Sequence, residues 1–324
     1  MRSSGRIVAL LLATACALCA APPRTVVVYC AVDEVFARPL LAEFERTTGI
    51  DVREVFDSES TKSVGLAVRL VQEKGRPRAD VFWNGEFSRT IFLKRNKVLA
   101  RYASPAAKTL PARFRDADHQ WAGHAVRTRV LAYNPERVKT PPKSIFELTK
   151  PAWRNRAAIC DPLIGTAAAW ATALYCQLGD DRADAYFRDL QRNGVKILPG
   201  NSVVADYVVK GLVEVGITDS DDVFVRQQQG KSIKAVLPDA DRLGTLAIPT
   251  TVALINRAPH PYEAKQLIDF LLSPRVEQAL AQSAGHLSVR GEALVKLKLI
   301  DVPFDEIGAR VDAITRRLAR LLGR

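Results

Sequence analysis

The sequence has little cysteine, with only five in 324 residues. Cys16 and Cys19 fall in an apolar stretch near the N-terminus, which leaves Cys30, Cys160 and Cys176 for the rest of the chain. Because three is an odd number, these thiols do not form a disulfide framework of the kind that holds small secreted domains together. A single bridge between two of the three stays open.

Standard catalytic motifs are also missing. The chain has no G-x-S-x-G nucleophile elbow, no H-E-x-x-H zinc motif and no dinucleotide fingerprint. The four histidines, His119, His124, His260 and His286, lack the paired spacing of metal ligands, so we interpret each as a surface or core residue. The sequence therefore favours a protein without a standard catalytic centre.

Long apolar runs are confined to the N-terminus. Arg2 and Arg6 precede an uncharged run over residues 7–19, and Ala20 and Ala21 follow it. This order is typical of a cleaved secretory signal peptide, which we place at residues 1–21. A lipoprotein anchor on one of the two early cysteines is the less favoured alternative. No later run is long enough to span a bilayer, so we expect an exported, periplasmic protein.

The charge balance is basic, with a formal net charge of +12. Lysine and arginine are dispersed along the chain and no aromatic residues alternate with them in a basic motif, so we expect no nucleic-acid partner. A basic exported protein is suited to anionic solutes or membrane surfaces. The length allows two domains, and 48% hydrophobic with 25% charged residues is an ordinary soluble composition.

Strand and helix patterns alternate along most of the chain. Short β-branched or apolar runs alternate with segments that have apolar residues at helical spacing, and glycines end several of these segments. This alternation predicts an α/β fold with mostly parallel sheets and helices on both faces. The predicted strands are 25–32, 50–56, 79–83, 157–160, 195–198 and 213–217, and the predicted helices are 36–44, 63–74, one from 86, 166–178, 181–193 and 202–210.

Two strands interrupt the alternation, at 126–134 and 244–255, and we predict that both cross between two lobes. The first lobe would comprise residues 24–126 and 246–290, and the second residues 127–245. Residues 291–324 form a C-terminal helical tail, whose last segment has apolar residues along one face. We expect this last helix to pack on a lobe rather than on a membrane surface.

An acidic cluster follows the predicted strand 213–217. It consists of Asp219, Asp221 and Asp222, with Ser220 among them. Because ligands of open α/β sheets bind at the carboxyl ends of strands, we interpret these residues as one wall of a binding cleft. Like charges so close together require a cation, an arginine or backbone amides to compensate them. The alternative is a solvated turn with a helix cap.

Two other helix starts follow strands directly. Gly165 and Thr166 open one helix, and Asn201 and Ser202 open the next. Unpaired N–H groups at a helix N-terminus bind oxyanions, although Asn201 or Ser202 could also simply cap its helix. On the first crossing strand, Arg127 and Arg129 would either clamp an anion or neutralise Asp219 and Asp221 in structural ion pairs.

The order of several motifs resembles class II periplasmic solute-binding proteins, and specifically the ferric-ion-binding branch that serves iron ABC importers. The similarity covers about residues 25–290, and its order is more specific than any one motif. The motifs are Tyr29 and Asp33 after the first strand, TTGI, ADVFW followed by Glu86, WAGHAVRTRVLAYN, DPLIGTAAAW, GNSVVADYVVKG and PHPYEAKQLIDFLLSP.

The resemblance implies a two-lobed type II fold that holds a ferric ion and a synergistic anion in the interlobe cleft. Arg129, Gly165, Thr166 and Asn201 match the family's anion cradle. The lobe-one metal ligands of the family, a histidine and a glutamate, fall near two acidic residues, Asp33 and, with a one-residue shift, Glu86.

The chain departs from the family at the adjacent tyrosines that are its principal iron ligands. Ser220 and Asp221 stand at these positions. A hard trication could still take carboxylates from Asp33, Glu86, Asp219 and Asp221. A phosphonate-like or other small oxyanion would satisfy the helix starts equally well.

The sequence thus leaves two classes of function open. The first is a monomeric receptor that closes on its solute and delivers it to the membrane subunits of an ABC importer, with no catalytic cofactor. The second, less favoured, is a cysteine-dependent enzyme on the same fold, like the thiamine-degrading enzymes, with Cys30 or Cys160 at a strand end as nucleophile.

Overall fold

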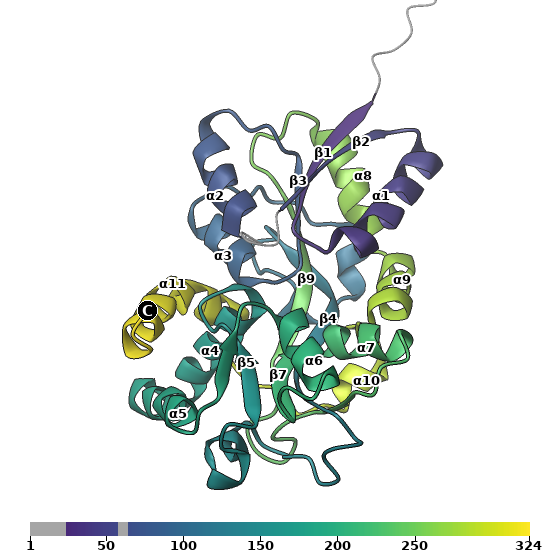
Figure 1. Cartoon of the computed structure of the whole chain (residues 1–324). Helices are drawn as coiled ribbons and strands as arrows, with labels where there is room; N and C mark the ends of the chain where they lie inside the picture. The colour runs from purple at the N-terminus through teal and green to yellow at the C-terminus, as the bar shows by residue number, and fades with distance from the viewer. Residues whose placement is uncertain (1–23, 58–63) are drawn as a thin grey trace, which may run out of the picture.

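The computed structural model describes residues 24–57 and 64–324 and shows two lobes, one above the other in Figure 1. The predicted signal peptide, with Cys16 and Cys19, lies outside these ranges. Within them, no helix combines the length and the apolar character needed to cross a membrane. The α/β fold predicted from the alternation is confirmed.

The upper lobe is built on parallel strands. β1 (Thr25–Cys30) pairs in parallel with β2 (Asp51–Phe56) and β3 (Val81–Asn84). These strands are rich in β-branched and aromatic residues, which favour a pleated, buried surface. α1 (Glu34–Thr48) follows β1, packs its apolar face inward and ends at Gly49, whose φ of 68° is the left-handed cap that glycine adopts without strain.

The lower lobe repeats this arrangement. β5 (Ala157–Cys160) lies between β6 (Lys196–Leu198) and β7 (Val215–Asp219), and both pairings are parallel. Several helices connect or follow these strands, and wherever the sequence predicted a start, the observed start lies within one residue of it. They are α4 (Gly165–Leu178), α5 (Asp180–Arg192), α6 (Asn201–Val209) and α7 (Ser220–Gln228).

Two long antiparallel strands join the lobes. β4 (Ala122–Tyr133) pairs with β9 (Ala247–Leu254) over Ala122–Thr128 and with β7 over Arg129–Tyr133. β9 also pairs with β3, so the full strand order is β2-β1-β3-β9-β4-β7-β5-β6, with the short β8 (Lys234–Val236) on β4. β4 therefore passes from one lobe to the other between Thr128 and Arg129.

The remaining elements cover the sheets and connect the strands. Two of them differ from the prediction. The helix predicted from residue 86 begins at 88. The helix predicted at 63–74 is α-helical over 64–72 in the described ranges. The helices are α2 (Val64–Gln72), α3 (Ser88–Arg95), α8 (Pro261–Leu271), α9 (Pro274–Ala284) and α10 (Glu292–Val295), and the 3-10 helices are η2 (Glu73–Gly75), η3 (Pro105–Thr109), η4 (Ala112–Phe114), η5 (Ile145–Thr149) and η6 (Pro151–Trp153).

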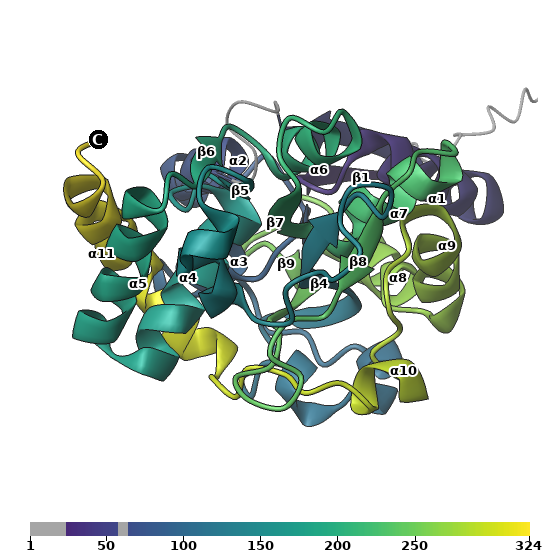
Figure 2. The same cartoon turned by 60° about the horizontal axis from the view of Figure 1, so that its bottom comes forward.

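The C-terminal helix α11 (Phe304–Leu321) spans the two lobes at one side of the molecule (Figures 1 and 2). It packs against both α3 of the upper lobe and α4 of the lower lobe, whereas the sequence predicted packing on one lobe. Ion pairs tie it to each: Arg89 with Asp312 above, and Arg317 with Asp184 below. The difference arises because its apolar stripe meets two helices that come from distant parts of the chain.

Candidate functional site

The acidic cluster begins where β7 ends. All five residues of β7 are buried, and its last residue, Asp219, immediately precedes α7. Gly216 within this strand allows α6 to approach closely, because a Cβ there would lie 2.3 Å from a methyl carbon of Val204. The close packing places the first residue of α6, Asn201, beside the side chain of Asp219.

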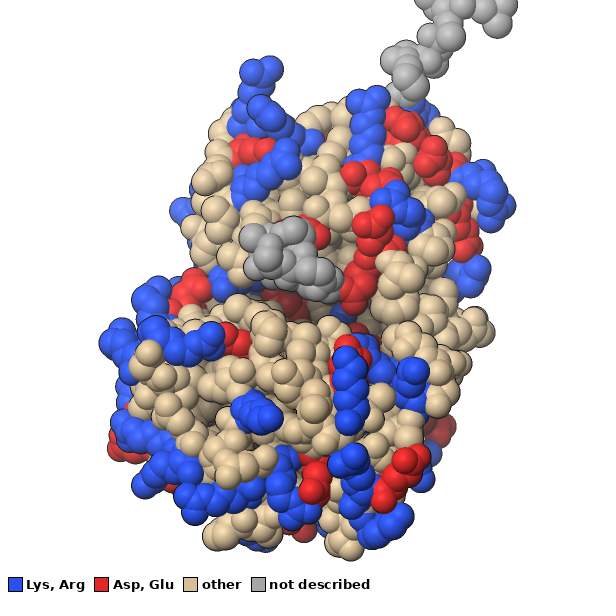
Figure 3. All heavy atoms as spheres, in the orientation of Figure 1, with Lys and Arg blue, Asp and Glu red and all other residues tan. Residues whose placement is uncertain are grey.

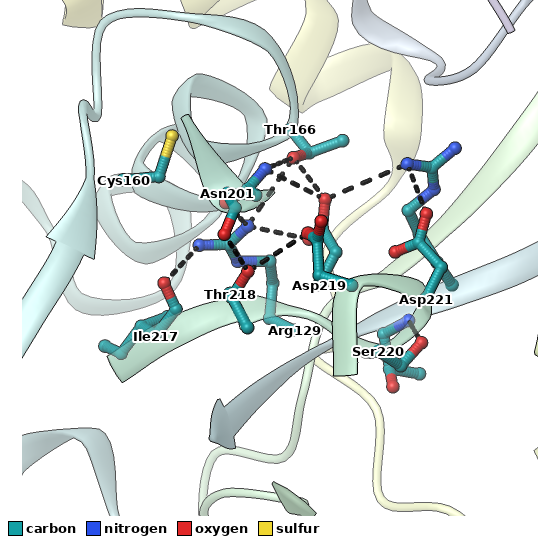
Figure 4. Close-up of polar contacts among 12 residues, drawn as sticks. Arg129, Cys160, Thr166, Asn201, Ile217, Thr218, Asp219, Ser220 and Asp221 are labelled. Carbon is teal, nitrogen blue, oxygen red and sulfur yellow. Dashed lines mark hydrogen bonds and ion pairs between the residues drawn. The ribbon is translucent and has the colours of Figure 1, made fainter. Parts of the chain in front are cut away.

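Asp219 is the centre of a buried hydrogen-bond network (Figure 4). The Nη1 of Arg129 donates to Asp219 Oδ1 at 2.6 Å and to Asn201 Oδ1 at 2.8 Å. The other carboxylate oxygen of Asp219 accepts from the Thr166 hydroxyl at 2.6 Å and from the Asn201 amide at 3.0 Å. The network therefore joins β4, β7 and the starts of α4 and α6.

Arg129 acts in this structure as the structural partner of Asp219. Its side chain is 1% exposed, and its Nη2 donates to the carbonyl of Ile217 at 3.4 Å. Its guanidinium also lies 5.5 Å from the ring centre of Trp170, at a distance suited to a cation–π contact. Of the two roles predicted for Arg129, the structure contains the ion pair.

Arg127 makes a second buried pair with Asp221, with 2.9 Å between Nη1 and Oδ2. Burial disfavours both charges, but their mutual attraction outweighs it, so the pKa of Arg127 is raised and the pKa of Asp221 is well below its usual range. The Nη2 of Arg127 also approaches Gly85 of the upper lobe, where an added Cβ would lie 3.4 Å from it. Arg127 thus stands at the junction of the lobes.

Asp222 completes the acidic cluster. It accepts from the Thr218 hydroxyl at 3.1 Å and lies 3.5 Å from Arg226. Burial, and then the neighbouring carboxylates of Asp221 and Asp219, raise the pKa of Asp222 well above its usual value. The three aspartates each place an oxygen within 4.8 Å of the others. Arg127 and Arg129 pair with Asp221 and Asp219, whereas Arg226 is shared between Asp222 and Asp206, which lies 3.0 Å from its Nε.

The N-termini of α4 and α6 lie side by side. Asn201 Nδ2 donates to Thr166 Oγ1 at 2.8 Å, and these residues belong to the first turns of the two helices. Neither helix has a side-chain cap on its first N–H groups in the described part of the chain. Ser202 is exposed beside them and Ile164 is 43% exposed, so the first turns border the surface.

Glu86 and Asp33, the two metal ligands predicted on the upper lobe, have different surroundings in the structure. Glu86 is 2% exposed and caps α3, since its carboxylate accepts from the backbone N–H groups of Ser88 at 2.5 Å and Arg89 at 2.9 Å. Among the described residues it is not part of the carboxylate cluster that could hold a metal. Asp33, which precedes α1, is half-buried and lies close enough to Arg127 to raise the pKa of that guanidinium.

Ser220 contacts the strand that joins the two lobes. Its hydroxyl accepts from the backbone N–H of Thr128 at 3.1 Å, which fastens the start of α7 to the point where β4 changes lobe. The site residues predicted on the lower lobe therefore lie close together around the point where β4 changes lobe, whereas Glu86 caps α3.

The structure adds one residue that the sequence did not single out. His286, which follows α9, is buried with Nε2 3.8 Å from Asp221 Oδ2, and neither ring nitrogen has a hydrogen-bond partner among the described residues. Burial lowers the pKa of His286 despite the nearby carboxylate. No sequence signal could have found this contact, because Asp221 lies on α7 and His286 in the loop after α9, far apart in the chain.

The surface between the lobes is hollowed, and acidic side chains are visible at the base of the hollow in Figure 3. Two cavities are found elsewhere, one of about 150 Å³ beside Tyr102 and Trp121 and one of about 530 Å³ beside Phe146 and Arg182. Neither is lined by a predicted site residue. The network around Asp219 is buried and belongs to neither of these cavities.

Two α/β lobes joined by crossing strands define the class of periplasmic binding proteins. Iron-bound HitA from Pseudomonas aeruginosa has this fold, with a TM-score of 0.83 and 22% identity over 91% of this chain and 99% of that one. AfuA from Actinobacillus pleuropneumoniae, solved with exogenous fructose-6-phosphate bound, has a TM-score of 0.79 and 22% identity over 93% and 98% of the two chains.

The chain belongs to the family of bacterial extracellular solute-binding proteins, whose model matches residues 78–307. A putative 2-aminoethylphosphonate-binding periplasmic protein of Salmonella typhimurium is 27% identical over 259 residues, which cover 77% of this chain and 72% of that protein. The Fe(3+)-binding periplasmic protein of Serratia marcescens is 25% identical over 292 residues, covering 86% and 84%. The family confirms the predicted solute-binding role.

Proposed function

We propose that this chain is the periplasmic solute-binding component of an ABC importer and that it captures a small phosphonate-like oxyanion between its lobes. The observation that carries this proposal is the meeting of two helix N-termini. Thr166 and Asn201 hold the first turns of α4 and α6 together, and neither helix has a side-chain cap. N–H groups of two helix starts, with their positive dipole ends, favour an oxyanion.

The charges around the acidic cluster support an oxyanion over a bare cation. Asp219 and Asp221 are each paired with a buried arginine, and burial raises the pKa of Asp222 and so favours its neutral form, which leaves the cluster little negative charge with which to hold a trication. Buried carboxylates that are already paired gain little from a metal that must first displace the guanidinium groups. The relatives named for 2-aminoethylphosphonate are compatible with this choice.

Ferric ion, as transported cargo with a synergistic anion, is the second candidate. The carboxylate oxygens of the three aspartates lie within 4.8 Å of one another, and hard cations prefer such oxygen ligands. The relatives that are named for iron belong to the same fold. With Ser220 and Asp221 in place of tyrosines, a ferric complex at this cluster would lack the strong visible colour of an iron tyrosinate.

A cysteine-dependent reaction is disfavoured by the thiols. Cys160 lies beside the network in Figure 4 but is 2% exposed, and burial raises its pKa to about 12. Its Sγ contacts the carbonyl of Asp161 at 3.9 Å. A nucleophilic thiolate needs a lowered pKa and an electropositive, accessible setting. We therefore propose a binding protein with no catalytic cofactor.

The proposed mechanism is hinge closure. Residues 24–126 and 246–290 would form one lobe, residues 127–245 the other, and the tail 291–324 would follow both. Closure would bend β4 and β9 near Thr128 and Ala247, where they pair with each other. A closed monomer would then present the solute to the importer's permease subunits.

The test uses the exposed Ser202 on the first turn of α6. Ser202→Glu places a negative charge at the helix N-terminus, which favours the helix but repels a bound anion, whereas Ser202→Gln is the matched neutral control. We expect saturating 2-aminoethylphosphonate or methylphosphonate to raise the Tm of the mature protein by several degrees. The Glu variant should lose about tenfold or more in affinity and the Gln variant little.

The same titration with ferric citrate separates the two candidates. Because a ferric ion would bring its own anion to the same helix starts, the parent protein decides between them: affinity for ferric citrate with no response to either phosphonate would overturn the oxyanion proposal. Retained phosphonate affinity in the Glu variant would instead place the anion away from α6.

A further inference from the structure

A second cavity lies at the opposite end of α4 from the candidate site. Its volume is about 530 Å³, which is the size of a small-ligand pocket. Because α4 has 14 residues, its two ends are about 20 Å apart. The cavity is lined by Phe146, Gln177, Leu178, Arg182, Arg242, Leu243, Lys298, Leu299 and Asp301.

The charges on this cavity are strongly unbalanced. Arg182, Arg242 and Lys298 line it, and within residues 24–57 and 64–324 none of the three makes an ion pair. Its single acidic residue, Asp301, is close enough to Arg113 to act on the pKa of that guanidinium, which burial lowers. Arg242 also interacts electrostatically with the carboxylate of Asp239, which offsets part of its charge. All three cations are exposed, and together around one space they generate a positive potential that favours an anion.

These cations have no evident structural task. Basic side chains near a helix C-terminus often bond its last carbonyls, but none of the three donates to a carbonyl of α4 in the described part of the chain. The ion pairs near this end of the helix are made instead by Arg310 and Arg317 of α11, which hold Asp180.

The remaining walls are apolar. Phe146 comes from η5, Leu178 from the end of α4, and Leu243 and Leu299 from two loops. A ligand that combines a phosphate group with a short apolar part would contact both kinds of wall.

The wall formed by the tail is fixed in place. Thr245 N donates to the Lys298 carbonyl at 3.0 Å, and Ile300 N donates to the Thr245 carbonyl at 2.9 Å. Gly244 permits this approach, because a Cβ there would lie 2.5 Å from the Lys298 oxygen. Figure 2 shows the yellow tail beside the green loop that leads into β9.

The same loop contacts the hinge. The Thr245 hydroxyl donates to the Arg129 carbonyl at 2.5 Å, and Arg129 N donates to the Leu246 carbonyl at 3.2 Å. A ligand held by Arg242 and Lys298 would therefore rest on the segment that enters the crossing strands.

We propose that this cavity is a second anion site, separate from the interlobe cleft, and that it takes a phosphate-bearing ligand with a short apolar part. A soluble phosphate ester and the headgroup of an anionic phospholipid share this chemistry. The proposal does not depend on the solute held in the cleft.

The test compares two charge-matched variants in the mature Ser202→Glu background. One carries Arg182→Gln, Arg242→Gln and Lys298→Gln, and the other carries Lys74→Gln, Lys210→Gln and Lys231→Gln, three exposed positions outside the cavity. Calorimetric titration with glycerol 3-phosphate and sedimentation with phosphatidylglycerol vesicles form the two arms, and phosphatidylcholine vesicles are the reference.

We expect the control variant to keep the parent's affinity in at least one arm, and the cavity variant to lose about tenfold or more, because charge-assisted hydrogen bonds contribute more to binding than neutral ones. Loss in the titration identifies a soluble ester as the ligand, and loss only with vesicles identifies a lipid headgroup. Equal losses in the two variants, or binding by neither the parent nor the control in both arms, would overturn the proposal. Thermal unfolding of each variant verifies that it is folded.

Discussion

Removing Arg129 should destabilise the protein far more than an ordinary surface charge deletion. The Arg129 and Asp219 side chains are 1% and 2% exposed and lie 2.6 Å apart. Arg129→Met fills a similar volume but leaves the buried carboxylate of Asp219 with Arg127, 4.0 Å away, as its remaining counter-charge. Breaking a buried pair in this way costs about 3–5 kcal/mol. For a protein of this size the Tm should fall by about 6–10 °C.

The expected loss of stability comes from the interaction between two residues, so the assay is a double-mutant cycle. Asp219→Asn removes the negative charge and keeps an acceptor for the Thr166 hydroxyl. Each single variant leaves one buried charge without its partner, whereas the double variant removes both charges of the pair. The free energy of unfolding, measured by urea denaturation, should therefore show a coupling energy of about 2 kcal/mol or more between the two positions.

Exposed pairs supply the control. Arg192 and Asp189 form an ion pair on α5 with side chains 74% and 43% exposed, and the corresponding cycle there should give a coupling energy of about 0–1 kcal/mol. Additive losses for Arg129→Met and Asp219→Asn, with a coupling no larger than in this surface pair, would refute the view that the network is held by a buried ion pair.

Three further outcomes are expected. Burial lowers the pKa of His124 to about 4, so this histidine binds a proton at higher pH in the unfolded chain than in the folded protein. Its contribution to stability is complete above about pH 6.5, and about 3 kcal/mol is lost as the pH falls from there through 4. His124→Phe should reduce this pH dependence in urea titrations at several pH values. Gly308→Ala would place a Cβ 2.6 Å from the Cβ of Ile91 and should lower stability by about 1–3 kcal/mol in thermal unfolding, whereas Gly75→Ala, with nothing within 4 Å, should not. Because burial raises the pKa of Cys160 to about 12 and of Cys176 to about 11, iodoacetamide at pH 8 should label neither thiol quickly until the protein is unfolded, and rapid labelling of Cys160 in the native state would contradict the inert role assigned to it.

Much of the site could be anticipated from local pattern. Gly165, Thr166 and Asn201 follow strands directly, and a residue at a helix start is placed by its own neighbours in the sequence. Asp219 was found for the same reason, as the end of an apolar strand. Glu86 shows the limit of this reasoning, because a carboxylate two residues before a helix can serve the helix itself, and here it caps α3.

The contacts of distant residues could not be anticipated. His286 meets Asp221 because α9 and α7 pack together, and a Cβ on Gly285 would lie 2.5 Å from the ring of Phe224. Such packing depends on side-chain shapes across the interior and leaves no periodic signal in the sequence.

Local sequence patterns were enough to predict the α/β class, most helix starts and the two crossing strands, because hydrophobic periodicity, glycine stops and strand composition act over a few neighbouring residues. The pairing of the charges, in contrast, depends on how the strands come together in space. Arg129 and Asp219 are 90 residues apart, and β4 and β7 must lie antiparallel with these residues in register before the guanidinium can reach the carboxylate. The pairing ties Asp219 to Arg129 and thereby sets the surroundings of the two helix starts that we propose bind the anion.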